Sequence, residues 1–282
     1  MNRFSTFILL AGLFHVSDLF AAPPNFGMLA LTEQPLRLIR GATLYQAPVG
    51  THLQAGDFIE SDQSNVQIDE LANISIALGA HTRIYLEHSG DSIRINLLTG
   101  WLKLQPMPGV QAQNLTVNTA TLSLDVSRSA SVIHASDARA EVFVESGTQP
   151  LTERDGRGHD GRKMTLKQEE YALRKGNEPM NAAGRPGSDF ISEMPTAFFD
   201  PLPVIVSKKL PGLPLNKVRD VSFDDVSPLL LSPLPLDTRY LVKRFAPRLS
   251  DPAFRQAITR RFGGTVEWET ALYRFERKSI QR

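Results

Sequence analysis

Two pairs of carboxylates are the residues of this sequence whose spacing could support acid–base chemistry. Asp57 and Glu60 lie three residues apart, and Asp69 is followed directly by Glu70. A glycosidase needs two carboxyl groups held at a set separation on either side of its substrate. Because the sequence alone defines no cleft, these pairs make a carbohydrate-active or other hydrolytic enzyme an alternative hypothesis and no more.

Other catalytic and ligand-binding patterns are missing from the sequence. It has no cysteine, no Gly-x-Ser-x-Gly elbow, no Walker motif and no Gly-x-Gly-x-x-Gly run. The loop DGRGHDG at residues 155–161 lacks the ligand series and terminal Glu of an EF-hand. We therefore expect no catalytic residue, no metal and no cofactor. The histidines have no metal-ligand spacing either: His52, His81, His88, His134 and His159.

Charge is distributed unevenly along the chain. Residues 30–150 carry seven Lys/Arg against twelve Asp/Glu, whereas residues 239–282 carry eleven against four. The segments LVKRFAPR and ITRRF also interleave basic and aromatic residues, as single-stranded nucleic-acid binders do. Such an asymmetry indicates either a basic tail attracted to the acidic body or an anionic partner outside the chain.

The N-terminus has the pattern of a secretory signal peptide. Arg3 precedes an apolar run over residues 4–16, and small residues follow at Ala21 and Ala22. The run is shorter than the ~20 residues of a spanning helix, so an uncleaved anchor is the weaker alternative. We expect a signal peptide over residues 1–21 and an exported protein, periplasmic or secreted, held at most peripherally at a membrane. Nucleic acid is then not an expected partner.

Residues 36–175 alternate apolar and polar side chains, with turn signals about every ten residues. This pattern predicts a mainly β fold of short antiparallel strands, as a sandwich, barrel or solenoid, with its last hairpin in residues 163–176. An open barrel would leave room for an apolar ligand, which is a further alternative function. Trp101 and Tyr85 are expected in the core rather than on a sugar-binding surface. The other expected core residues are Leu53, Ile59, Ile76, Leu86, Ile95, Leu102, Val117, Leu124, Val142 and Val144.

Four residues are predicted to shape turns in this region: Gly56, Asp57, Gly100 and Gly147. Glycine allows positive φ and close approach, so the chain is expected to reverse at Gly56 and Gly100 and to end a strand at Gly147. Asp57 is expected to bond its own backbone two residues on. These roles are structural rather than ligand-binding.

The same positions resemble the FecR domain. GTHLQAGDFIES at residues 50–61 is similar to the family pattern G-x-x-L-x-x-G-D-x-I-x-T/S, and VFVESG at residues 142–147 is similar to its closing V-x-V-x-x-G. The resemblance implies a β domain over residues 30–175 in a cell-envelope protein. Anti-sigma members carry a cytoplasmic segment and a membrane helix before this domain, whereas here it follows the predicted leader. The chain is therefore not expected to be an anti-sigma regulator itself.

The C-terminal part differs in kind, because ten of the nineteen prolines fall between Pro195 and Pro252. We expect a Pro-rich linker with short helices over residues 176–235 and a basic α-helical tail over residues 236–282. Ser222 and Asp225 have the spacing of a capping box. Ser250 is predicted to cap a later helix that ends at Gly263.

The tail is predicted to place its apolar and basic residues on opposite faces. Phe254, Ile258, Phe262, Trp268 and Leu272 recur at helical spacing and are expected to form one cluster. Arg255, Arg260 and Arg261, with Arg248 nearby, would then form a solvated basic face. The hypothesis is a non-catalytic interaction or scaffold module that binds an envelope protein or an anionic envelope polymer through this face.

Overall fold

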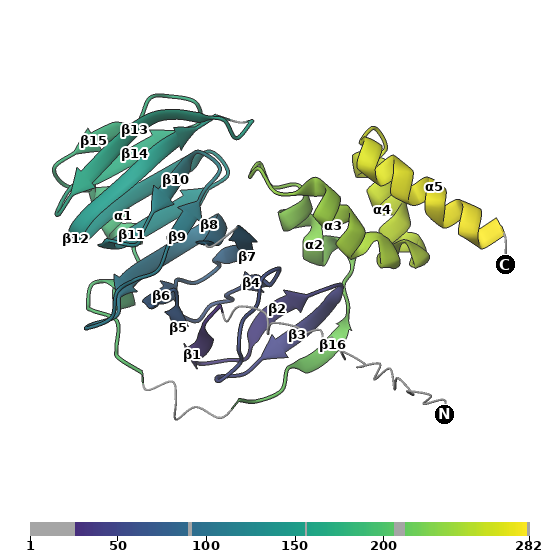
Figure 1. The fold of residues 1–282 in the computed structure, drawn as a ribbon, viewed down its shortest axis with the longest axis horizontal. Coiled ribbons are helices and arrows are strands. Elements are labelled where there is room, and N and C mark those ends of the chain that lie inside the picture. The colour runs from purple at the N-terminus through teal and green to yellow at the C-terminus, as the bar shows by residue number, and fades with distance from the viewer. Residues whose placement is uncertain (1–25, 90–91, 156, 206–211, 281–282) are drawn as a thin grey trace, which may run out of the picture.

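The computed structural model describes residues 26–89, 92–155, 157–205 and 212–280, and the predicted mainly β fold is confirmed (Figure 1). Strands occupy the chain from Met28 to Ala183, and the described helices follow them together with one further strand. The predicted signal peptide lies outside the described residues. So do Gly90 and Asp91.

The first sheet is antiparallel throughout. Its C-terminal edge strand is short and exposed, whereas its central strands are buried. In spatial order it contains β1 (Met28–Thr32), β5 (Val66–Leu71), β6 (Ile74–Leu78), β8 (Ser92–Pro106), β11 (Ser129–Ser136), β12 (Arg139–Arg154), β14 (Tyr171–Lys175) and β15 (Asn181–Ala183).

The second sheet combines early strands with one strand from far along the sequence. All neighbours are antiparallel except β8 and β9. In spatial order it contains β16 (Asn216–Asp220), β3 (Thr43–Ala47), β2 (Leu36–Arg40), β4 (Phe58–Glu60), β7 (Arg83–Ser89), β8, β9 (Leu115–Asn118), β10 (Leu122–Asp125), β12 and β13 (Asp160–Lys167).

Two long strands, β8 and β12, belong to both sheets. The first half of β8 pairs with β7, and from Gly100 onward it pairs with β6 and β11. β12 pairs with β11 up to Gly147 and with β13 from Thr148. The backbone is left-handed at both glycines, with φ of 100° and 81°. The reversal expected at Gly100 and the strand end expected at Gly147 were therefore wrong: each glycine bends a continuous strand from one sheet into the other.

The space between the sheets is filled by aliphatic side chains. All ten predicted core residues are buried there, and Trp101 and Tyr85 are buried on the outer faces of the sheets. The predicted last hairpin was wrong in its pairing. β13 and β14 follow one another, but each pairs with a different half of β12, because that strand serves both sheets.

Helical segments cover both outer faces of the sheets. On the first sheet, α1 (Ser188–Glu193) and the 3-10 turn η1 (Thr196–Phe198) place Phe190 and Phe198 in a cluster with Trp101. On the second sheet, Ile39, Phe58 and their neighbours form one cluster with the C-terminal helices. These helices, called here the helical unit, are α2 (Phe223–Leu230), α3 (Thr238–Phe245), the 3-10 segment η3 (Ala246–Ser250), α4 (Pro252–Phe262) and α5 (Val266–Ile280).

The local helix signals were mostly correct. Ser222 and Asp225 form a reciprocal capping box at the start of α2. The cap of α4 is Asp251 rather than Ser250, because its carboxylate accepts the N–H of Ala253 at 2.9 Å. The expected linker also contains β16, which pairs with β3 and so joins the helical unit to the second sheet. The predicted tail cluster is confirmed within the apolar contact of these helices.

Gly100 offers a direct test of the bend in β8. A Cβ there would lie 2.6 Å from the Cα of Thr82, and φ is unfavourable for any L side chain. We expect Gly100→Ala to lower the free energy of unfolding by about 2 kcal/mol or more in urea titration. Gly184→Ala is the matched control, since a Cβ there would meet nothing within 4 Å. Equal stability of the two variants would contradict the proposed bend.

Candidate functional site

Asp57 is a structural residue beneath the corner that contains Gly56. It is fully buried, and Arg40 donates two hydrogen bonds to its carboxylate, at 2.8 and 2.7 Å. The carboxylate also accepts the N–H of Gln54 at 2.9 Å, so the expected bond to a residue two positions on was wrong. Burial raises the pKa of Asp57, although the hydrogen bonds from Arg40 oppose this rise. The buried ion pair fixes the corner.

The other candidate carboxylates are also engaged in local contacts. Glu60 forms ion pairs with both Arg37 and Arg83. Asp69 accepts a hydrogen bond from the Gln67 amide at 2.9 Å. Carboxylates that already bind guanidinium groups have fewer oxygen lone pairs left for a substrate. Two of the four carboxylates, Asp57 and Glu60, therefore form structural ion pairs, and a third, Asp69, accepts a local hydrogen bond.

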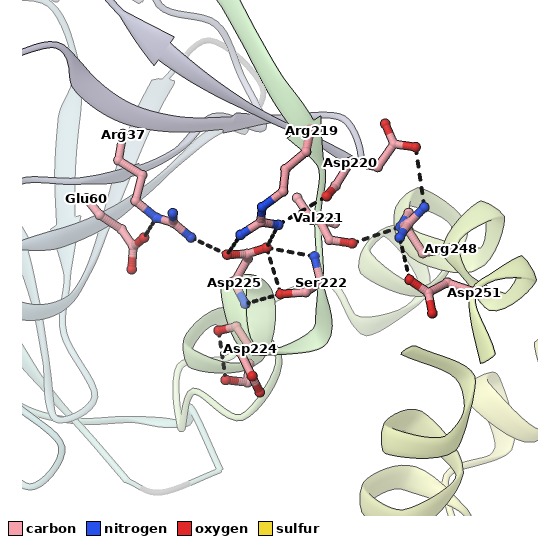
Figure 2. Close-up of polar contacts among 11 residues, drawn as sticks. Arg37, Glu60, Arg219, Asp220, Val221, Ser222, Asp224, Asp225, Arg248 and Asp251 are labelled. Atoms are coloured by element: carbon pink, nitrogen blue, oxygen red, sulfur yellow. Dashed lines mark hydrogen bonds and ion pairs between the residues drawn. The ribbon is translucent and has the colours of Figure 1, made fainter. Parts of the chain in front are cut away.

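A polar groove of about 870 Å³ lies where β2, β4, β7, β16 and α2 meet. Arg37, Glu60, Arg83 and Arg219 line it, and Asp224 lines it from α2. Figure 2 shows Asp225 beside Arg37 and Arg219. Arg219 donates to Asp225 at 2.9 Å, and Arg37 does so at 2.5 Å from the opposite side. This polar junction links β2, β16 and the start of α2.

Asp225 is the centre of the polar junction. Burial opposes its ionisation, but hydrogen bonds from Arg219, Ser222 and Arg37 hold the pKa of Asp225 well below its usual range. Ser222 donates through its backbone N–H at 2.7 Å and through its hydroxyl at 2.8 Å. One carboxylate therefore completes the helix cap and binds two arginines at once.

Arg244 of α3 makes a second link between the helical unit and the sheet. Its guanidinium donates to the backbone carbonyls of Ile39, Gly41 and Gly56 at 2.9, 2.7 and 2.6 Å. The same group lies over the ring of Tyr85, 5.9 Å from its centroid. Burial lowers the pKa of Arg244. This one side chain therefore donates to three backbone carbonyls beneath α3.

The four arginines predicted to bind a partner do not form one free face. Arg248 donates to the carbonyl of Val221 and to Asp251, both at 2.8 Å. Arg255 donates to the carbonyl of Leu249 at 2.6 Å and packs over Phe275. These two hold the helices together, which corrects the expectation for them. Partner binding stays a prediction for Arg260 and Arg261, which are exposed.

Another basic surface was missed in the sequence. A groove of about 770 Å³ lies between α3 and α5, and four cations line it: Arg239, Lys243, Arg274 and Lys278. Each pair is spaced at i, i+4 on its helix, which places both members on one face. That spacing was the available signal. Which two helices would face each other depended on tertiary packing.

The histidines and acidic residues in the described ranges form no group of three or more that could hold a metal ion. His134, for example, stacks on Trp101 with 4.2 Å between ring centroids and hydrogen-bonds Glu141 at 2.9 Å. Across those same ranges, the helices lack the combination of length and apolar character that crossing a bilayer requires.

The fold and this site define a two-sheet β protein with a docked helical unit. No family model matches the sequence, and no curated protein matches it either. Two crystal structures of a "putative anti-sigma factor" from Parabacteroides distasonis, at 1.65 and 2.50 Å resolution, are similar over part of the chain. For each the TM-score is 0.38 and the identity 16%, and the match covers 45% of this chain and 59% of that one. This likeness is too distant to assign a family or an activity.

Asp225 provides a pH-dependent test of the polar junction. Its pKa is lower in the folded chain than in the unfolded chain, so its ionisation stabilises the fold above pH about 4 and this contribution is lost as pH falls. We expect Asp225→Asn to lower the free energy of unfolding at pH 7 by about 2 kcal/mol. The difference from the wild type should shrink as pH falls below about 4.

Asp224→Asn is the control for this test. Asp224 is the exposed neighbour of Asp225 in the first turn of α2, and it forms no ion pair among the described residues. Chemical denaturation between pH 3 and 8 should show little change for it. A pH-independent loss for Asp225→Asn would contradict the role given to its charge.

Proposed function

We propose that this chain is a non-catalytic cell-envelope protein whose FecR-like β scaffold presents the helical unit to a protein or an anionic polymer. Export to the envelope is part of this proposal and rests on the pattern of residues 1–21. The FecR resemblance rests on the motifs at residues 50–61 and 142–147 together with the two-sheet fold.

The proposal rests on a contrast among the arginines of the helical unit: some bind the β scaffold, and others are exposed to solvent. Arg244 and Arg248, which face the scaffold, bind its carbonyls and carboxylates. Arg260 and Arg261 are exposed, and no ion pair to either occurs among the described residues. The unit is thus fixed on one side and cationic on the other, as expected of a surface that attracts anionic partners.

The two alternative functions have weaker support. A hydrolase would need two carboxylates that converge on a substrate, whereas Asp57 and Glu60 are held by different arginines. A carrier of an apolar ligand would need an open interior. The space between the sheets is instead occupied by side chains such as Ile76, Ile95 and Val142. Both considerations favour an interaction module.

Co-sedimentation of the purified chain with envelope fractions tests the proposal. We expect binding at low salt that weakens as salt rises, because exposed charges are screened beyond about 8 Å at physiological ionic strength. Arg260→Gln with Arg261→Gln should reduce sedimentation with unchanged melting. Arg255→Gln should instead lower melting, since Arg255 bonds Leu249 and packs on Phe275. No sedimentation at any salt concentration would overturn the proposal.

A further inference from the structure

The α3–α5 groove has an apolar floor. Its lining includes residues from α3, η3 and α5. At one end of the groove the floor continues to Val266, which is 71% exposed. Apolar surface left in a concave site gains free energy when a partner covers it. The half-buried floor residues are Ala246, Ala271 and Phe275. Val242 and Leu249 also line the groove but are already buried in the fold.

Cations flank this floor on both sides. Arg239 and Lys243 form one row on α3, and Arg274 and Lys278 form the other on α5. Within each row the charges lie one helical turn apart, about 6 Å along the axis. Glu267 is the one acidic residue in the lining. The groove therefore has a row of positive charge on each helix with an apolar strip between them.

The side chains of the four cations bind no other residue in the described part of the chain. No ion pair or hydrogen bond of their side chains occurs there, in contrast to Arg244, which binds three carbonyls. Like charges at i, i+4 repel each other by a few tenths of a kcal/mol. A ligand that brings carboxylates to both rows would remove this repulsion as well as add attraction.

Charge complementarity selects the occupant. A polymer that carries only anionic groups would leave the apolar floor exposed to water, and an apolar ligand would leave both rows unpaired. An amphipathic helix with apolar residues at i, i+3, i+4 and i+7 fits the floor, and acidic residues on its flanks fit the rows. α5 spans fifteen residues and α3 eight, or about 22 and 12 Å, so the shared groove accommodates about two to three turns.

We propose that the α3–α5 groove docks an acidic amphipathic helix of a partner protein. The four cations bind carboxylates on its two flanks, and the floor binds its apolar stripe. This inference rests on the proposed function as an interaction module and names the chemistry of the partner.

The test uses a fluorescein-labelled peptide of about fifteen residues, with Leu at helical i, i+3, i+4 and i+7 spacing and Glu on both flanks. Fluorescence anisotropy with the purified chain should show saturable binding. Lys243→Gln with Arg274→Gln, one change in each row, should raise Kd about tenfold at low salt, or about 1.4 kcal/mol. Arg260→Gln with Arg261→Gln is the matched control on the same helical unit and should leave Kd unchanged.

Two further arms test the helical register and the charge rule. A scrambled peptide of the same composition should bind at least about tenfold more weakly, because its leucines no longer form one stripe. Lys243→Glu with Arg274→Glu should gain affinity for the peptide in which Lys replaces Glu. Equal binding of the scrambled peptide, or equal loss in the control variant, would overturn the proposal. Vesicles of phosphatidylglycerol that displace the peptide from the groove would favour a lipid surface and overturn it as well.

Failure of this inference differs from failure of the proposed function. If the chain sediments with envelope fractions but no peptide binds, the groove proposal falls and the interaction module stands. If the peptide binds through Lys243 and Arg274 but no envelope fraction retains the chain, the groove proposal stands and the envelope role falls.

Discussion

The part of the second sheet formed by β2, β4 and β7 is buried on both faces, and this constraint organises the rest of the molecule. Strands β2, β4 and β7 direct Leu38, Ile59 and Ile84 toward the first sheet, while neighbours such as Ile39 and Phe58 point outward. An uncovered face of this kind would be an aggregation-prone apolar surface. The helical unit covers it, and Arg244 donates to three backbone carbonyls at the same boundary. The unit is thus part of the fold rather than a separate tail.

This cover also explains which charges remain for binding. Cations near the sheet form structural contacts; Arg219 and Arg37, for example, form ion pairs with Asp225 (Figure 2). Cations on the far side of α3, α4 and α5 form no such ion pairs in the described part of the chain. The net charge of a segment therefore overstates what a partner could meet, because packing separates structural from available charges.

The sequence predicted the parts of the structure that depend on local pattern. Period-2 alternation identified the strands and the core, and the Ser222–Asp225 spacing identified a helix start. The sequence did not predict β16, nor which residues Arg248 and Arg255 contact. β16 is exposed along its length and has no alternating pattern, so only its partner β3 makes it a strand. The arginine contacts depend on which helices meet, and this is decided by tertiary packing rather than by spacing along the chain.

The same reasoning applies to the two glycines. Their residue type correctly indicated unusual backbone, and both have positive φ. A turn and a bend within a strand use the same left-handed conformation, so the sequence around Gly100 and Gly147 does not distinguish them. The length of β8 and β12 becomes evident only when the pairing of both sheets is known.

The distance in sequence between the second sheet and its cover has a kinetic consequence. Arg37 meets Asp225 across 188 residues, and Ile39 meets Arg244 across 205. During synthesis the early strands are made long before residues 223–280. The outer face of the second sheet therefore stays exposed to solvent until the chain is almost complete. Contacts of such separation slow folding, because loop closure precedes any gain from packing. Nascent chains that end before α2 would therefore be the species most in need of a chaperone.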